Sequence, residues 1–441
     1  MFKFKSIVIV FLILSLVPRV SFASVPDETA YIFNTLLFLI GGVLVMWMAA
    51  GFTMLEAGLV RVKNVGDICL KNLLLYSLAC IAFYAVGYNL MYDGVAGGFF
   101  GSLTTWFADD SAALADTADY SAGYAASSDF FFQMVFVATT ASIVSGTVAE
   151  RIKLFPFLIF TAVLAAFIYP LQGSWQWGGG WLSELGFSDF AGSTLVHSVG
   201  GWAALTGAVI LGPRLGRYDN KGRVRPMPGS NLPMATLGTF ILWVGWFGFN
   251  GASQLALGSA TDSVAVANIF ANTNMAASGG ALMAAFVAKK IYKKVDLTMT
   301  MNGALAGLVS ITAGPDTPSV GAAILIGAVG GALVVFTIPM LDRFKIDDVV
   351  GAISVHLFCG IWGTMAVPLT NPNASFSVQF IGIAAIGLMV VVSSSVVWLL
   401  LKATVGLRLG EDEELIGSDV TELGLEAYPE FGHGSQKLGD H

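Results

Sequence analysis

Two histidines stand inside long apolar stretches, and both close the same short pattern. Residues 189–197 read DFAGSTLVH and residues 348–356 read DVVGAISVH, so that Asp, Gly, Val and His recur at identical offsets. A neutral imidazole has one nitrogen that donates a hydrogen bond and one that accepts, which suits it to passing a proton. The pattern therefore points to proton chemistry at His197 and His356 in an apolar environment.

The composition identifies that environment. Hydrophobic residues make up 56% of the 441-residue chain and charged residues only 12%, whereas an ordinary soluble domain has about 25% charged residues. Glycine is abundant, with 51 residues, as expected where helices approach closely in lipid. We therefore predict an all-α polytopic membrane protein. The three scattered cysteines, Cys69, Cys80 and Cys359, indicate neither a disulfide framework nor a zinc site.

The first 23 residues are typical of a signal peptide. Lys3 and Lys5 precede an apolar run at 7–17, and small residues at 21–23 stand where a signal peptidase cleaves. The apolar run is too short to cross a bilayer. We therefore expect residues 1–23 to be removed rather than retained as an uncleaved first helix.

Eleven apolar windows follow, each close to the about 20 residues needed to span a bilayer. They cover residues 32–57, 69–92, 130–149, 154–172, 193–212, 232–250, 264–288, 298–314, 319–340, 350–368 and 376–401. The eighth is rich in glycine and the least well defined. We assign the windows to a transmembrane domain (24–403) of two five-helix halves (about 30–214 and 230–368) and an eleventh helix (about 376–402), followed by a tail (404–441).

The positions of Lys and Arg predict how the chain is oriented. Loops 93–129 and 173–192 contain neither residue, whereas the alternate loops and the tail carry Lys, Arg or both. Because basic loops remain in the cytoplasm, we expect the mature N-terminus outside and the C-terminus in the cytoplasm. The expected location is a bacterial cytoplasmic (inner) membrane.

This orientation relates the two histidine motifs as an inverted-topology repeat. Asp189 lies just outside the fifth span and Asp348 just inside the tenth, so the motifs enter the membrane from opposite faces. Each His lies ~12 Å beyond its Asp along a helix, near the middle of a hydrocarbon core about 30 Å thick. Transporters built from inverted repeats bind or pass their substrate at this depth.

Simpler roles are open for the same residues. Asp189 and Asp348 suit helix N-caps and sources of negative potential, and we interpret them mainly in that structural and electrostatic sense. A single buried His would suit a hydrogen bond between two helices. A pair at one depth favours a pathway, because ionisable groups inside membranes usually line one. A metal would need further ligands, which the sequence does not place at that depth.

A second group of residues collects at the outer ends of the spans. Phe132 and Phe136 share one face of the third span, Trp177 ends the fourth, and Phe249 and Ser253 end the sixth. Interfacial anchoring or ordinary packing would explain each aromatic residue alone. Together they suit a small cation, since aromatic faces attract a desolvated cation by roughly 2 kcal/mol or more. Ammonium donates hydrogen bonds to a hydroxyl oxygen, whereas K⁺ donates none.

The chain resembles the ammonium transporter family (Amt/Mep/Rh), and its Amt branch more than Rh. The resemblance runs from the first span to the tail, and the matching stretches are highly specific as a set. They are GFTMLEAGLVRVKN (51–64), FFFQMVFVATTASIVSGTVAERIK (130–153), WGGGWL (177–182), DFAGSTLVH (189–197), GWFGFN (245–250), DDVVGAISVHLFCGIWG (347–363) and VGLRLGEDEELIGSDVTELGLEAYPEF (405–431).

The resemblance implies roles for the aromatic residues. Phe136, Trp177 and Ser253 match an external site that recruits ammonium, with Phe132 as an aromatic wall. Phe136 and Phe249 match a stacked pair of rings that gates the pore.

The resemblance also implies a conduction path. His197 and His356 match twin histidines that line a hydrophobic pore, and Asp189 matches an acidic residue below the outer vestibule. The family implies a homotrimer with one pore per subunit and a tail that contacts the neighbouring subunit. The expected substrates are ammonium or ammonia and methylammonium, taken up as nitrogen, with no cofactor and no metal.

These parts lead to a hypothesis for the mechanism. A charge at the bilayer centre costs at least ~3 kcal/mol, so an apolar pore favours neutral ammonia. We expect ammonium to bind at the mouth, to lose its proton below the phenylalanine gate and to cross as ammonia. The histidines would relay the proton separately. K⁺ would be excluded because it has no neutral form.

Three other classes of protein fit the sequence less well. An ammonium sensor with little transport is the main rival, although only about 40 residues follow Leu401, too few for a catalytic signalling domain. The resemblance to the family also implies a regulatory tail or docking of a P-II-type signal protein at the cytoplasmic mouth. An enzyme lacks support because no Ser or Cys nucleophile stands beside a base, and no feature indicates nucleic acid binding. A conventional cation channel would present rings of carbonyls or carboxylates, which the apolar spans lack.

Overall fold

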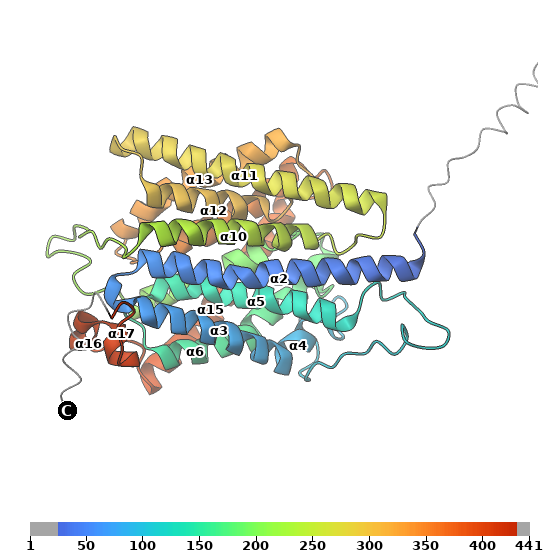
Figure 1. Cartoon of the computed structure of the whole chain (residues 1–441), viewed down its shortest axis with the longest axis horizontal. Coiled ribbons are helices and arrows are strands. Elements are labelled where there is room, and N and C mark those ends of the chain that lie inside the picture. Colours follow the sequence, from blue (N-terminus) through green and yellow to red (C-terminus); the bar gives the residue numbers. More distant parts are fainter. Residues whose placement is uncertain (1–24, 430–441) are drawn as a thin grey trace, which may run out of the picture.

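The computed structural model describes residues 25–429 and shows helices packed side by side along one direction (Figure 1). Within these residues there is no β-strand, only two isolated bridges. Within residues 25–429, eight helical runs are long and apolar enough to cross a membrane. They are α2 (Asp27–Leu59), η1 to α4 (Val62–Tyr92), α5 (Ala126–Val148), α6 to α8 (Leu154–Glu184), η4 with α9 (Ser193–Leu211), α10 (Leu232–Ala252), α13 (Val320–Arg343) and α15 (Phe376–Thr404).

Three further helical runs complete the bundle. The 33-residue helix α11 (Ala260–Tyr292) is long but less apolar, and two shorter apolar runs are α12 (Leu297–Ile311) and η5 to η6 (Ile353–Leu369). Each of the eleven predicted windows therefore falls on a helical run. The all-α membrane fold that we predicted is confirmed.

Several of the runs are interrupted by π turns, which widen a helix locally and are frequent at functional sites. The π turns are η2 (Phe83–Gly87) between α3 (Val65–Ala82) and α4 (Tyr88–Tyr92), η3 (Leu164–Ile168) between α6 (Leu154–Val163) and α7 (Tyr169–Gln176), η4 (Ser193–Ser198) before α9 (Val199–Leu211), and η5 (Ile353–Phe358) before α14 (Cys359–Ala366). The short helices α8 (Trp181–Glu184), η1 (Val62–Asn64) and η6 (Val367–Leu369) complete these runs.

Local sequence explains where the helices of the second half begin. The side chains of Asn231, Ser259, Asp296 and Ser319 each accept a hydrogen bond from the backbone N–H three residues later. These residue types are preferred N-caps because they satisfy an otherwise free N–H of the first turn.

The glycine content of the eighth window reflects how closely α12 packs. It packs against both α11 and α13, which lie beside each other in Figure 1. A Cβ added at Gly280 of α11 would lie 2.2 Å from the carbonyl oxygen of Gly303 in α12, and one at Gly331 of α13 would lie 2.0 Å from the carbonyl oxygen of Gly280. Only glycine permits backbones to approach so closely, in the manner of small residues in membrane helix packing.

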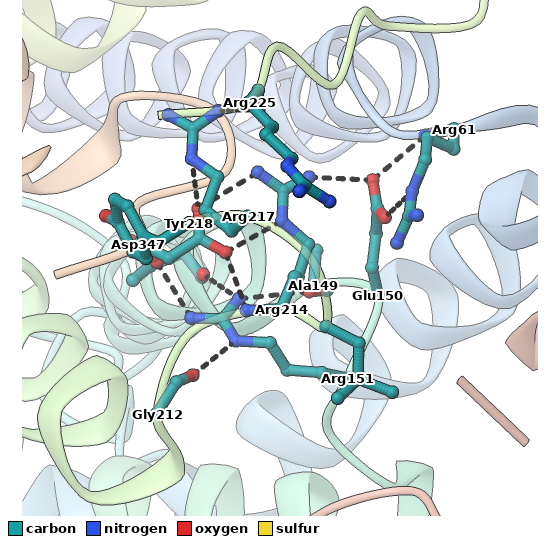
Figure 2. A network of polar contacts seen from close by, with 12 residues as sticks. Arg61, Ala149, Glu150, Arg151, Gly212, Arg214, Arg217, Tyr218, Arg225 and Asp347 are labelled. Atoms are coloured by element: carbon teal, nitrogen blue, oxygen red, sulfur yellow. Dashed lines mark hydrogen bonds and ion pairs between the residues drawn. The ribbon is translucent and has the colours of Figure 1, made fainter. Parts of the chain in front are cut away.

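A buried network of charges joins the loops at one end of the bundle (Figure 2). Glu150 accepts from Arg61 at 2.5 Å and from Arg214 at 3.0 Å, and Arg214 also pairs with Asp347 at 2.8 Å. Arg151 donates to the Asp347 carbonyl at 2.7 Å. These residues follow the first, third and fifth runs and precede the tenth. The basic loops that we predicted to share one side therefore meet at one end.

The ionisation of Asp347 is governed by its partners. Burial raises the pKa of this carboxyl, but the hydrogen bonds from Arg214 and the charges of Arg151 and Arg214 outweigh burial and hold the pKa well below its usual range. The same ion pairs raise the pKa of Arg214 against the opposing effect of burial. The network is therefore charged at neutral pH.

Two short helices of the tail, α16 (Glu411–Ile416) and α17 (Ser418–Leu423), pack against this end of the bundle (Figure 1). Asp419 accepts from the backbone N–H groups of Gly66 and Asp67 at 2.9 and 2.8 Å, and Glu422 accepts from that of Leu154 at 2.9 Å. The tail thus caps the first turns of α3 and α6, where a carboxylate is favoured. We call this end of the bundle the tail end.

The predicted domain boundaries lie partly beyond this description. The predicted signal peptide (1–23) and the last part of the tail (430–441) lie outside the described residues. The predicted contact of the tail with a neighbouring subunit stays a prediction, and the contacts described above are within one chain.

Candidate functional site

The two repeated motifs bring their histidines together in the interior of the bundle. His197 lies in the π turn η4 and His356 in the π turn η5. Their Nδ1 atoms are 3.2 Å apart, and their ring centroids are separated by 5.2 Å with an interplanar angle of 23°. His197 is fully buried, and 3% of His356 is exposed. The two motifs, 159 residues apart, therefore form one hydrogen-bonded pair.

The glycine that follows each histidine by four residues permits this meeting. A Cβ on Gly201 would lie 2.7 Å from the backbone N of Leu357, and one on Gly360 would lie 2.4 Å from the carbonyl oxygen of Ser193. Each glycine therefore lies against the π turn of the other motif. The repeated Gly keeps the two helices close enough for their imidazoles to bond.

The aspartates of the motifs accept hydrogen bonds from backbone N–H groups in the first turns of these helices. Asp189 is buried and accepts four backbone N–H bonds, from Gly192, Ser193, Thr194 and Leu195, at 2.8–3.1 Å. Such bonds satisfy the N–H groups that a helix start leaves free. Burial raises the pKa of Asp189 to about 6, although these backbone donors lower it. Asp189 therefore lies where the sequence pattern predicted a helix N-cap.

Asp348 makes a similar but smaller set of contacts at the tail end. It accepts from the backbone N–H groups of Ala352 and Ile353 at 3.1 and 2.8 Å, and from the hydroxyl of Thr147 at 2.9 Å. The last bond ties the second motif to α5. Asp348 therefore fixes the start of η5 and, through it, the position of His356.

Aromatic rings continue the histidine pair toward the other end of the bundle. His197 stacks on Trp246 at 4.9 Å and on Phe249 at 5.2 Å. Phe249 in turn stacks on Phe136, with ring centroids 4.1 Å apart and an interplanar angle of 28°. Phe136, Phe249, His197 and His356 therefore form a continuous column of rings, which we call the ring column.

A cavity of about 320 Å³ opens at the end of this column opposite to the tail end. Phe132, Phe136, Trp177 and Ser253 all line it. Phe132 and Trp177 meet Phe136 edge-on, at 4.8 and 6.1 Å between centroids. The Ser253 hydroxyl donates to the Phe249 carbonyl at 2.7 Å, so its oxygen keeps lone pairs for a donor in the cavity. We call this cavity the aromatic pocket.

The pocket also contains residues that sequence reasoning missed. Tyr88, Tyr92, Tyr124 and Asp129 line it too. The Asp129 carboxylate accepts from the Tyr88 hydroxyl and, at 3.3 Å, from the Gln133 amide. Burial and the Asp129 charge raise the pKa of Tyr124 to about 12. Asp129 precedes Phe132 and Phe136 by three and seven residues, a spacing that shares one helix face and would have signalled its place.

Comparison with known proteins identifies the class of molecule that carries this site. Residues 36–428 match the Ammonium Transporter Family. The chain belongs to this family. It is 40% identical over 427 residues to the ammonium transporter Amt2 of Archaeoglobus fulgidus, with 89% of this chain and 87% of the relative covered. The function that we predicted, ammonium transport across a membrane, is therefore confirmed.

Solved structures agree with this assignment. The structure titled Sensor Amt Protein matches with a TM-score of 0.83 and 34% identity, covering 90% of this ammonium transporter and all of that chain. Mep2 from Candida albicans matches with a TM-score of 0.78 and 26% identity, covering 92% of both chains. The relatives named as transporters favour transport over a sensor role. The roles of the individual pocket and pore residues stay predictions.

Proposed function

We propose that this ammonium transporter binds NH₄⁺ in the aromatic pocket, removes its proton below the Phe136–Phe249 stack, and conducts NH₃ past the histidine pair. The proton follows separately along the two imidazoles. The observation that supports this most strongly is the ring column, in which the pocket, the stacked phenylalanines and the bonded histidines succeed one another.

The chemistry of the pocket suits a small cation that donates hydrogen bonds. Three aromatic rings, Phe132, Phe136 and Trp177, surround the cavity and present faces or edges to it. Asp129 adds a carboxylate to the wall, and Ser253 offers a hydroxyl oxygen. NH₄⁺ uses all of these contacts, whereas K⁺ uses the charge but not the hydrogen bond.

An ammonium ion must lose its proton, and with it the positive charge, before it passes the stacked phenylalanines. Phe136 and Phe249 are 2% and 0% exposed, and their rings are in contact. A cation passing between them would lose its hydration and gain little in return, at a cost of at least ~3 kcal/mol. Neutral NH₃ avoids this cost, so deprotonation precedes passage.

The histidine pair then supplies a route for the proton. Because the two Nδ1 atoms are 3.2 Å apart, one of them donates and the other accepts. The relay begins when a proton binds to Nε2 of His197. The proton on Nδ1 of His197 then moves to Nδ1 of His356. His356 in turn releases the proton on its own Nε2. His197 Nε2 is buried without a partner among the described residues, so it is free to take the proton.

The cellular setting follows from the arrangement of charges. We place the tail end in the cytoplasm of a bacterium and the aromatic pocket outside, after removal of residues 1–23, because the basic loops meet at the tail end. The large apolar side chains exposed on α2 and α3, such as Trp47 (53%) and Leu73 (66%), suit lipid or the subunit contacts of a homotrimer. The docked tail offers a surface to a P-II-type signal protein.

Electrophysiology on purified protein in liposomes tests the proposal. Pulses of ammonium and methylammonium should give inward currents, and pulses of K⁺ at equal concentration should give none. A K⁺ current would favour a conventional channel instead. Ammonium binding without any current or ammonia flux would favour a sensor.

A further inference from the structure

A narrow second cavity lies on the tail-end side of the histidine pair. His356 lines it, and so does Glu56 of α2. The remaining lining is largely apolar and comes from α2, α5, α12 and the segment around η5. Its other residues are Phe52, Leu55, Ser142, Ile143, Gly146, Asn302, Leu305, Val350, Ala352 and Val355. A buried carboxyl group therefore shares a small cavity with the last histidine of the ring column.

The Glu56 carboxyl is only partly engaged by its neighbours. The side chain is 0% exposed, and its Oε2 accepts from Ser145 Oγ at 2.7 Å and from Asn72 Nδ2 at 3.3 Å. Its Oε1 is buried and has no hydrogen-bond partner among the described residues. A buried carboxyl oxygen without a partner is costly, so this atom is suited to receive a water molecule or a proton.

The charged groups around Glu56 leave that oxygen free. From α3, Lys71 donates to the Ser145 carbonyl at 3.3 Å rather than to Glu56, and Asp67 stands one turn before Lys71. From η5, His356 lines the shared cavity, and α5 contributes Ser142, Ile143 and Gly146 but no titratable side chain to the lining. Lys71 thus supplies positive charge nearby without occupying the free oxygen.

The spacing along α2 places Glu56 on the tail-end side of His356. Phe52 lies 6.1 Å from His356 between ring centroids. Glu56 follows Phe52 by four residues, so it lies on the same face about one turn, or roughly 5 Å, nearer to the tail end. Gly146 of α5 lies beside Glu56, because a Cβ there would be in van der Waals contact with Glu56 Cγ at 3.5 Å.

We propose that Glu56 is the acceptor that takes the transported proton after His356 and passes it toward the tail end. This rests on the proposed function. His356 Nε2–H donates its proton to a water in the narrow cavity while that water gives one of its own protons to Glu56 Oε1. The imidazole becomes neutral, the carboxylate becomes a carboxylic acid, and water is regenerated. Loss of that proton to solvent at the tail end resets Glu56.

The test compares ammonium-pulse currents of the native protein and Glu56→Gln in liposomes between pH 5 and 8.5. Gln keeps an oxygen for Ser145 but cannot accept the proton. The ammonium current of the variant should therefore fall about tenfold or more, which is within the usual contribution of a positioned acid or base. The solvent isotope effect on the current in D₂O should also change. Glu56→Asp, which retains a titratable group, should restore part of the current with a shifted pH midpoint.

Asp412→Asn is the matched control, because it removes one negative charge at an exposed position of the tail end, away from the cavity. It should keep the native pH midpoint, and thermal unfolding in detergent checks that each variant is folded. Native current and pH dependence in folded Glu56→Gln would overturn the inference and leave ammonium transport intact. If Glu56→Gln does not fold, a native pH midpoint in Glu56→Asp would overturn it. Absence of ammonium current in the native protein would instead contradict the proposed function.

Discussion

At the scale of single residues, the proposed cation site in the aromatic pocket depends on how its rings are held in place. Trp177 is held in place because its indole N–H donates to the Asp189 carbonyl at 3.0 Å. The same bond joins the pocket to the start of the first histidine helix. The pocket and the pore are therefore connected by a single side chain as well as by the ring column.

Replacement of Trp177 tests the cation site. Trp177→Leu should raise the ammonium concentration that gives half-maximal current by roughly 30-fold, which corresponds to the about 2 kcal/mol of a desolvated cation–π contact. Concentration-dependent current in liposomes measures this. Trp175→Leu is the control, since Trp175 lies on the same helix but bonds to the Phe99 carbonyl and does not line the pocket. Equal shifts in both variants would argue against cation binding by Trp177.

At the scale of helices, the position of the histidines depends on how closely two π turns approach. The sequence predicted the eleven helical runs, the shared depth of His197 and His356, and the clustering of the aromatic residues near one end. It could not predict the π turns, because the wider turn arises from packing between helices and leaves no local pattern. Glu56 was part of a quoted stretch, but its approach to His356 depends on the packing of α2 against α5.

Substitution of the repeated glycine tests this close approach. Gly360→Ala should lower stability by about 2 kcal/mol through overpacking, because its Cβ would meet the Ser193 carbonyl oxygen and the Ser198 hydroxyl at 2.4 Å. The current should fall with it. Gly321→Ala in α13 has open space, so it should gain up to about 1 kcal/mol from helix propensity. Thermal unfolding in detergent distinguishes the two, and an unaffected Gly360→Ala would contradict the packing described.

The buried charge network makes a prediction about pH. The pKa of Asp347 is lower in the folded protein than in the unfolded chain, where it is about 4. The ionised carboxylate therefore stabilises the fold fully above about pH 4, and this stabilisation is lost as the pH falls toward the pKa of the folded protein. Asp347→Asn should therefore cost roughly 3 kcal/mol at pH 7, and this difference should shrink below about pH 4. Thermal unfolding across pH 3–7 measures it.

The neighbouring Asp342 provides the control for that experiment. It pairs with Arg217 at 2.9 Å, but both side chains are partly exposed, at 18% and 15%. Asp342→Asn should therefore cost at most about 1 kcal/mol. A cost for Asp347→Asn that is no larger than this, or that does not depend on pH, would contradict the role of the network.

At the scale of the whole molecule, the tail and the transmembrane helices form one structure. The resemblance to the family predicted a tail that contacts a neighbouring subunit, but the sequence did not indicate where the tail lies on its own chain. Asp419 and Glu422 cap helices more than 250 residues away, and contacts of such separation have no signature in the local sequence. A partner that bound to the tail would therefore contact the segment that caps the starts of α3 and α6.

Removal of the Asp419 carboxylate tests this docking. Asp419→Ala should speed hydrogen exchange at the amides of Gly66 and Asp67 by roughly fivefold to tenfold, as expected for loss of about 1 kcal/mol of capping. Asp412→Ala, at an exposed position of α16, should leave these amides unchanged. Exchange measured by mass spectrometry that is identical in both variants would contradict capping by the tail.

The central claim is that the bonded histidines separate ammonia from its proton and so exclude K⁺. The most direct measurement is the current of the His197→Ala, His356→Ala double variant in liposomes, with ammonium and K⁺ pulses compared to the native protein. Loss of the ammonium current, or appearance of a K⁺ current, is the result that the claim predicts. A native ammonium current with K⁺ still excluded would contradict it.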